Sequence, residues 1–108
     1  MRIVISTCRP EEAEKIANAL VGERLVASVN MIPGGKTRVR FKDECITQEE
    51  TLLIMRTRSE LVWKLEERIP QLNSFEIPEI ATIEIREYSA SYANWLKEAT
   101  MQKGDIVY

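Results

Sequence analysis

The chain has 108 residues, of which 44% are hydrophobic and 30% charged, and its formal net charge is −2. This balance is typical of one globular domain with a single core, so we expect residues 1–108 to form one domain. It excludes a disordered chain, and the acidic charge gives no support to nucleic-acid binding.

No apolar run approaches the ~20 residues that a membrane-spanning helix needs, so we expect no membrane association. The N-terminus enters a strand pattern directly and shows no signal-peptide plan. Cys8 and Cys45 are too few for a disulfide framework. These features predict a cytoplasmic protein with reduced thiols.

The first third of the chain predicts a strand followed by a helix. Residues 2–7 are a short β-branched run, which indicates a buried central strand. Pro10 suits the first turn of a helix, and apolar residues then recur at helical spacing up to Gly22, where we expect the helix to end.

The next segment predicts a long hairpin. Residues 27–32 and 36–41 both show extended patterns, and Pro33-Gly34-Gly35 interrupts them, so one long bent strand is expected. Residues 42–44 are expected to form the hairpin tip, and residues 50–57 a return strand buried on both faces. For Cys45, near the tip, strand packing is favoured over thiol chemistry.

A second helix follows, for which Thr57 or Ser59 is the expected cap, and Trp63 lies off its apolar stripe. Residues 80–86 alternate as a strand, with the following side chains directed inward: Ala81, Ile83 and Ile85. A third helix is expected to pack Tyr92 and Trp95 into the core, and residues 104–108 to form a short edge strand.

The resulting order is β-α-β-β-α-β with an additional C-terminal helix. This predicts an α+β, ferredoxin-like fold with an antiparallel sheet and helices on one face. The other face is then solvated or buried by further subunits. Because a long hairpin and free sheet edges also need covering, we predict a homotrimer.

Residues 73–80, Asn-Ser-Phe-Glu-Ile-Pro-Glu-Ile, join the second helix to the last strand. Pro78 fixes its own φ and biases the preceding residue toward extended geometry, so the helix cannot continue. Glu76 and Glu79 flank this corner, and Phe75 precedes it. The segment is either a binding site or a structural corner.

Cys8 is the one candidate metal ligand. It precedes a helix start and is followed by Arg9, and both features favour the thiolate, a soft ligand suited to Cu(I). The alternative, favoured because no second soft ligand is visible, is a small residue at a strand end.

Several charged residues near strand ends form a second candidate set. They either line a cleft between subunits that binds a hard cation or a small anion, or form structural ion pairs between subunits. The predicted cleft residues are Asn30, Glu50, Arg56, Phe75, Glu76 and Glu79.

Lys36, Arg38, Arg40 and Lys42 share one side of a strand by period two. Such a row can recognise a polyanion, but in an acidic chain a solvated face is the favoured interpretation. Trp63, off its helix stripe, indicates an interface.

Short motifs in a specific order give this chain a family resemblance. They are Glu23–Asn30, Ile32-Pro33-Gly34, Glu50, Leu52–Arg58, Phe75–Ile80, Tyr92 and Trp95-Leu96. Together they resemble the divalent-cation tolerance proteins, CutA. The resemblance implies a homotrimer of ferredoxin-like subunits, similar in build to the PII signalling trimers, with a role in tolerance of copper and other divalent metals.

The chain departs from the family pattern at several positions. Asn73, Ser74 and Phe75 stand where the family has His-Pro-Tyr, and Ser28 replaces its second-strand cysteine. Since the proposed family copper ligands include that histidine, a copper site of the family type is in question for this chain.

Three functions are therefore weighed. The first is a non-enzymatic trimer for divalent metal tolerance, with copper or another divalent metal as its ion. The second is a PII-like sensor of a small anion at subunit clefts. The third is an acylphosphatase-like enzyme, which is disfavoured because no phosphate loop or nucleophile–base pair is present.

Overall fold

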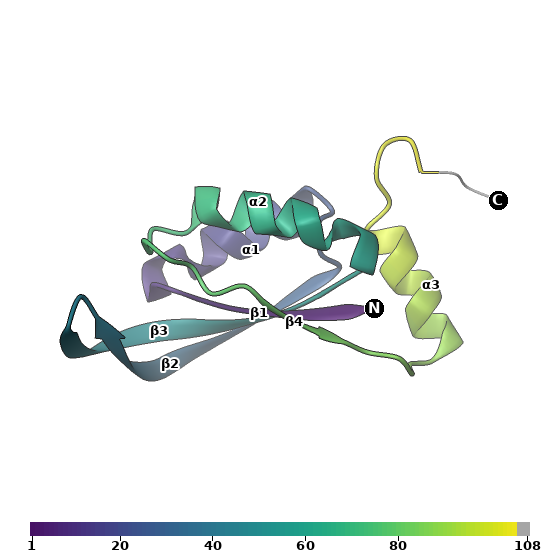
Figure 1. Ribbon diagram of the computed structural model, residues 1–108. Coiled ribbons are helices and arrows are strands. Elements are labelled where there is room, and N and C mark those ends of the chain that lie inside the picture. Colours follow the sequence, from purple (N-terminus) through teal and green to yellow (C-terminus); the bar gives the residue numbers. More distant parts are fainter. Residues whose placement is uncertain (106–108) are drawn as a thin grey trace.

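Four antiparallel strands form one sheet in the order β2-β3-β1-β4, and two helices lie over one of its faces (Figure 1). The computed structural model describes residues 1–105. Its elements are β1 (Arg2–Cys8), α1 (Ala13–Gly22), β2 (Ser28–Phe41), β3 (Glu44–Thr57), α2 (Val62–Leu72), β4 (Ala81–Glu84) and α3 (Ala90–Ala99). This order confirms the predicted α+β, ferredoxin-like fold. The expected C-terminal edge strand falls mostly on residues 106–108, outside the described part of the chain.

The core lies between the sheet and the two helices α1 and α2. Side chains alternate along β1 and along residues 51–57 of β3, so every second residue there faces the helices and is buried. The main members of this core are Val4, Leu53 and Met55 from the strands and Ile16, Leu20, Leu65 and Ile69 from the helices. The intervening Leu52 and Ile54 are half-buried, so β3 is not buried on both faces within one chain.

Helix α1 ends at Gly22 as expected, whereas the expected caps of α2 differ from the structure. After Gly22 the left-handed residue that reverses the chain is Arg24, with φ 60°. Neither Thr57 nor Ser59 caps α2, which begins after a 3₁₀ turn over Ser59–Leu61. The Thr57 hydroxyl instead donates to the Leu25 carbonyl oxygen at 2.6 Å, because its strand faces it toward the core.

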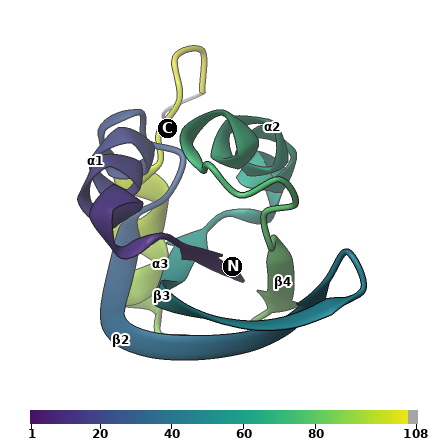
Figure 2. The same cartoon turned by 90° about the vertical axis from the view of Figure 1, so that its left-hand side faces the viewer.

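The β2–β3 hairpin is confirmed and extends well beyond the helices. Both strands have 14 residues, and their register shifts between Ile32 and Gly35. A bulge of this kind bends a strand and increases its twist. Lys42 (φ 50°) and Asp43 (φ 64°) form the two-residue turn. The hairpin curls upward at its tip (Figure 2), where Lys42 Nζ comes within 3.6 Å of Glu76 Oε2.

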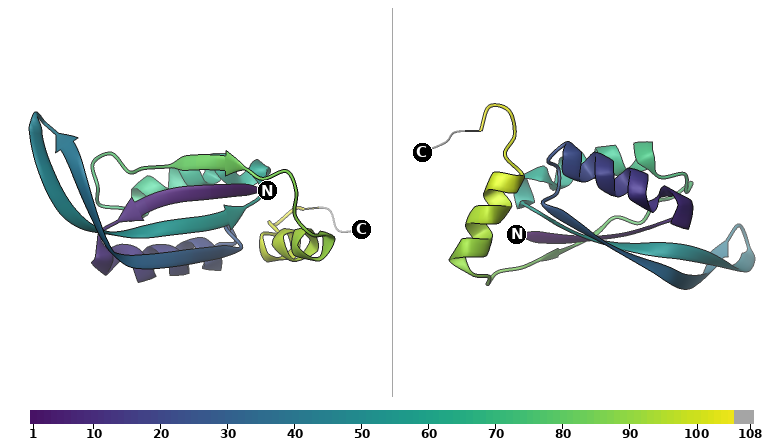
Figure 3. Two further views of the ribbon diagram at one scale, coloured as in Figure 1. Left: turned by 90° about the horizontal axis from the view of Figure 1, so that it is seen from below. Right: turned by 180° about the vertical axis from the view of Figure 1, so that it is seen from behind.

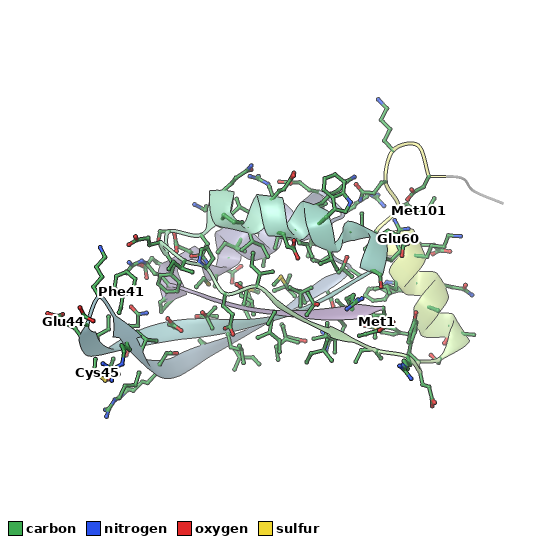
Figure 4. All side chains as sticks on the ribbon, in the orientation of Figure 1. Met1, Phe41, Glu44, Cys45, Glu60 and Met101 are labelled. Carbon is green, nitrogen blue, oxygen red and sulfur yellow. The ribbon has the colours of Figure 1, made fainter. Side chains whose placement is uncertain are left out.

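The sheet face opposite α1 and α2 has no helix over it, as the view from below shows (Figure 3, left). We call it the open face; its side chains project from the underside of the sheet (Figure 4). It carries the apolar residues Ile3, Ile5, Ile32, Leu52, Ile54, Ala81 and Ile83. The prediction that Ala81 and Ile83 point into the core of the chain is therefore wrong. Both are exposed because their strand positions alternate away from the helices, while Ile85 is half-buried.

Helix α3 lies at the end of the sheet and not over it (Figure 1). Within it only Leu96 is buried, and Trp95 is 43% exposed with its ring against Tyr92. The predicted core packing of Trp95 is thus wrong. Arg58 anchors the segment after α3 by donating to the Thr100 carbonyl oxygen and the Asp105 carboxylate at 2.8 and 2.9 Å. Within residues 1–105 no helix has the length and apolarity needed to cross a membrane.

Candidate functional site

A cavity of about 890 Å³ lies between the curled hairpin and the segment that joins α2 to β4. Residues 74–79 of that segment form one wall, and the facing side of the hairpin forms the other. Thr7 and Arg9, at the end of β1, close the space between them. This volume falls within the range of ligand pockets, so the cavity can enclose a small molecule.

The hairpin wall follows from the alternation of side chains along paired strands. Register places Thr37 opposite Gln48 and Val39 opposite Ile46, so these side chains share one side of the hairpin. Phe41 and Glu50 extend the same row toward the tip and toward the sheet. Phe41 lies near the hairpin tip (Figure 4). The wall is thus apolar near the tip and polar near the sheet.

Glu50 is the deepest charged group of the cavity and is only 5% exposed. Thr37 Oγ1 donates to its Oε1 at 2.7 Å, and Gln48 Nε2 donates to its Oε2 at 2.9 Å. Both partners are neutral. None of the ion pairs found within residues 1–105 includes Glu50.

Asn73 fixes the opposite wall. Its amide nitrogen donates to the Thr7 carbonyl oxygen at 2.8 Å, and its side-chain oxygen accepts from the Phe75 backbone N–H at 2.8 Å. The residue is buried, at 6% exposure. These bonds tie the segment to the end of β1 and set the direction in which Phe75 leaves the helix.

The rim of the cavity carries charges of both signs. Arg9 Nε donates to Ser74 Oγ at 2.9 Å, and its guanidinium lies 5.2 Å from the centre of the Phe75 ring. The Ser74 hydroxyl in turn donates to the Glu12 carboxylate at 2.9 Å. On the hairpin side Lys42 Nζ lies 3.6 Å from Glu76 Oε2, between two exposed side chains. Exposed pairs of this kind contribute ~1 kcal/mol or less.

The structure brings four of the six predicted cleft residues together. Glu50, Phe75, Glu76 and Glu79 all line the cavity. The other two, Asn30 and Arg56, form a pair elsewhere on the open face, where Arg56 Nη1 donates to Asn30 Oδ1 at 2.5 Å. Glu79 is exposed and makes no ion pair with Arg56 within the chain.

Cys8 is fully buried against the helices, and its environment opposes the thiolate. Burial raises the pKa of this thiol to about 11, and the charges of Glu12, Glu50 and Glu11 add to the effect. The burial agrees with the favoured interpretation of Cys8 as a small residue at a strand end, and it opposes the thiolate alternative, which was based on Arg9 and the helix start alone. No three His, Cys, Asp or Glu side chains among residues 1–105 are grouped to hold a metal ion. The donor set of one described chain therefore does not fit a tight metal centre.

Sequence reasoning missed the neutral groups that surround Glu50. Thr37 and Gln48 were not singled out, although the period-two row of cations at Lys36, Arg38 and Arg40 already implied a second row on the opposite side of that strand. The contact between this row and residues 74–79 depends on the curl of the hairpin, for which the sequence carries no local signal.

Most of the remaining candidates do not line the cavity. Lys36 and Arg38 are exposed on the outer side of the hairpin, where Glu49 opposes Lys36, as expected of a solvated face. Arg40 is exposed too but contributes to the cavity lining. Cys45 lies near the tip, in register with Arg40, and is exposed, which differs from the strand packing that the sequence favoured (Figure 4). Trp63 is 56% exposed on α2, which confirms that it lies off the apolar stripe.

Fold and site together define a ferredoxin-like α+β protein with a ligand-sized cavity beside an uncovered apolar sheet face. Residues 2–99 match the model of the CutA1 divalent ion tolerance protein family. The chain is 38% identical over 98 residues to the divalent-cation tolerance protein CutA of Thermus thermophilus, covering 91% of this chain and 95% of that protein. The chain therefore belongs to the CutA1 family, a family of tolerance proteins and not of enzymes.

Solved structures agree with this assignment. A divalent cation tolerance protein of Thermus thermophilus superposes with a TM-score of 0.87 at 38% identity, over 94% of this chain and 100% of that one. The apo form of the PII-like protein CutA from Nostoc sp. PCC 7120 superposes with a TM-score of 0.87 at 31% identity, over 94% and 98% of the two chains. The fold is therefore that of the PII-like CutA proteins.

Proposed function

We propose that this protein acts in the cytoplasm as a homotrimer that contributes to tolerance of divalent metal ions, copper among them. Membership of the divalent-ion tolerance family is the observation that carries the proposal. In this role the ion is the species to be tolerated and not a resident cofactor.

The open face supports the trimer. Ile83 and Ile32 are 49% and 46% exposed there, beside the half-buried Ile3, Ile5 and Ile54. A contiguous apolar sheet face is a typical interaction surface, and closed association of three chains buries it in each copy. We also propose that the cavity lies at a cleft between neighbouring subunits.

Any direct copper binding is proposed to be weak and to depend on Cys8. A protonated, buried thiol is a poor ligand, because metal binding requires the thiolate. The histidine of the family pattern is replaced by Asn73, whose amide is occupied by two backbone groups.

Native mass spectrometry of protein purified without chelator tests assembly and bound ions together. We expect a trimer without stoichiometric copper. Calorimetry with Cu(I) on wild type and on Cys8→Ser then tests the ligand, and we expect weak binding that the substitution removes. A monomer contradicts the assembly, and an undiminished tight copper site in Cys8→Ser contradicts the assignment of Cys8.

A second candidate function is a PII-like sensor of a small molecule, which the ligand-sized cavity favours. The sequence suggested an anionic ligand for such a sensor. The cavity is lined by three carboxylates, those of Glu50, Glu76 and Glu79, and by two exposed arginines, Arg9 and Arg40. Its one buried charged group is the carboxylate of Glu50, which disfavours an anion at that end.

A further inference from the structure

Glu50 is a buried carboxylate that lacks a cationic partner among residues 1–105. Each of its oxygens accepts one hydrogen bond from a neutral donor, Thr37 or Gln48. A carboxylate oxygen accepts more than one bond, and a buried charge without an opposite charge is costly. Glu50 therefore has capacity for a further, positively charged donor from the cavity.

The position of Glu50 is built into the backbone. At the register shift of the hairpin, Gly35 pairs with Glu50, and a Cβ on Gly35 would lie 3.0 Å from the Glu50 carbonyl oxygen. The two strands thus approach closely at this point. This close approach holds Thr37 and Gln48 on either side of the carboxylate, so the polar end of the cavity is preorganised.

The charges around the cavity do not neutralise Glu50. Arg9 is engaged by Ser74 and the Phe75 ring. Arg40 also lines the cavity but forms no ion pair with Glu50 among residues 1–105, and Glu76 and Glu79 add two carboxylates to the lining. The charge of Glu50 is also felt within the core, where it is one of the causes, after burial and Glu12, that raise the pKa of Cys8.

The rest of the cavity is apolar. Val39, Phe41 and Ile46 line the hairpin wall, and Phe75, Ile77 and Pro78 line the facing wall. A ligand that fits this space has a hydrophobic body between two apolar walls and a donor-rich head at the polar end. Small-molecule pockets commonly combine apolar walls with a few polar groups that fix the orientation of the ligand.

We infer that the cavity binds a small organic cation, a protonated amine on an apolar body, with its ammonium group hydrogen-bonded to Glu50. An ammonium carries three donors and no acceptor. Thr37 gives its hydroxyl hydrogen to Glu50 and keeps acceptor lone pairs, and Gln48 likewise donates through nitrogen and keeps its carbonyl oxygen. The three side chains thus match the three donors.

Two other classes of ligand fit less well. A hard divalent cation takes six or more oxygen ligands, and the described residues contain no cluster of acidic side chains to supply them. An anion would meet Glu50 with both of its neutral donors already committed to that carboxylate. This inference does not depend on the proposed role in metal tolerance.

Benzylamine, benzyl alcohol and benzoate provide a matched series of probes with one ring and a positive, neutral or negative head. We expect calorimetry at pH 7 on the full chain to detect benzylamine at millimolar concentration or below, with roughly tenfold or weaker binding of benzyl alcohol and no binding of benzoate. Amide chemical-shift changes at Thr37, Gln48 and Phe75 would locate the bound amine.

Glu50→Gln removes the charge and keeps a carbonyl acceptor for Thr37, so benzylamine affinity is expected to fall about tenfold or more. Glu49→Gln is the matched control, because it removes the same charge one residue away on the exposed outer side of the hairpin. Its affinity should equal that of wild type.

The inference is overturned if benzylamine does not bind at millimolar concentration, which is the result expected if a second copy of the chain fills the cavity. Equal or tighter binding of benzoate or benzyl alcohol overturns it as well, and so does undiminished affinity in a folded Glu50→Gln. The probe series on wild type decides the question even where the variant fails to fold. Loss of metal tolerance or of the trimer is a separate result and does not enter this test.

Discussion

Two cysteines that look alike in the sequence have opposite environments in the structure. Cys8 is fully buried and Cys45 is exposed. For Cys8 the sequence favoured a small strand-end residue over a reactive thiolate, and its burial agrees with that interpretation; for Cys45 the sequence favoured strand packing, whereas the residue is exposed. Thiol reactivity depends on burial first and then on nearby charges, which for Cys8 include Glu12 and Glu50.

In the native protein at pH 8 we expect one thiol per chain to react rapidly with a disulfide reagent. Cys45→Ser should abolish this rapid phase, and the second thiol should react only after unfolding. Spectrophotometric titration with and without denaturant measures both phases. Rapid reaction of the Cys45→Ser protein would contradict the buried placement of Cys8.

The raised pKa of Cys8 also predicts a dependence of stability on pH. The folded state favours the protonated thiol, so this contribution is complete below the ordinary pKa of 9.0 and is lost as pH rises to about 11. The loss is about 2 to 3 kcal/mol. Urea unfolding of wild type and Cys8→Ala at pH 8 and pH 11 isolates this loss. The difference in the free energy of unfolding between the two proteins should shrink by this amount from pH 8 to pH 11.

Asn73 is the residue that fixes the segment between α2 and β4. Asn73→Ala removes a buried amide and leaves the Phe75 N–H and the Thr7 carbonyl oxygen without these partners. We expect the free energy of unfolding to fall by ~1–3 kcal/mol. Asn94→Ala, at an exposed site on α3, is the control and should change it by ~0.5 kcal/mol or less. Equal decreases in the free energy of unfolding for the two variants, measured by urea titration, would contradict the role of Asn73 in joining this segment to the end of β1.

At the scale of elements, the hairpin was the most predictable part of the fold. Alternation predicted β2, and Pro33-Gly34-Gly35 marked the irregularity that appears as a register shift. A continuous apolar run predicted the return strand from residue 50, although β3 already begins at Glu44. The curl that brings Phe41 toward residues 74–79 was not predictable, because twist accumulates over 14 residues and no single residue encodes it. The sequence therefore identified four residues of the cavity but did not predict the two walls that bring them together.

The hairpin turn provides a test at this scale. Lys42 and Asp43 both have positive φ, which a β-branched side chain strongly resists. Asp43→Val should lower the free energy of unfolding by ~1–2 kcal/mol, whereas Asp43→Gly should stay within ~0.5 kcal/mol of wild type. Thermal or urea melts of the two variants measure the contrast, and equal stability would place the turn elsewhere.

At the scale of the whole molecule, the open face explains why the sequence misassigned β4. Ala81 and Ile83 alternate as inward residues do, but the helices lie on the other side of the sheet. Periodicity identifies an apolar side and does not say what covers it. The same ambiguity applies to Trp95, whose helix lies beyond the end of the sheet.

Ile83→Asp tests the proposed assembly. A charge on the open face should dissociate the trimer, because an unpaired buried charge costs several kcal/mol. Val21→Asp on α1 is the control, since Val21 is 43% exposed against 49% for Ile83 but lies on a helix and not on the open face. Light scattering should report a monomer for the first variant and a trimer for the second. A trimer in both would place the subunit contacts elsewhere.

Strand β3 has a genetic consequence that follows from its alternation. Leu53 and Met55 face the helices, while Glu50, Leu52 and Ile54 face the other way. The odd-numbered residues of this stretch therefore pack in the core, and the even-numbered residues line the open face and the cavity. Deleting or inserting one codon within residues 50–57 would reverse the facing of the residues on one side of the change, so that residues of the open-face set would point toward the helices and core residues away from them. Adding two codons on each side of the turn at Lys42 and Asp43 would preserve the facing of both sets of side chains. Insertion and deletion scanning should therefore find this gene intolerant of single-codon length changes along β3 but permissive at the hairpin tip.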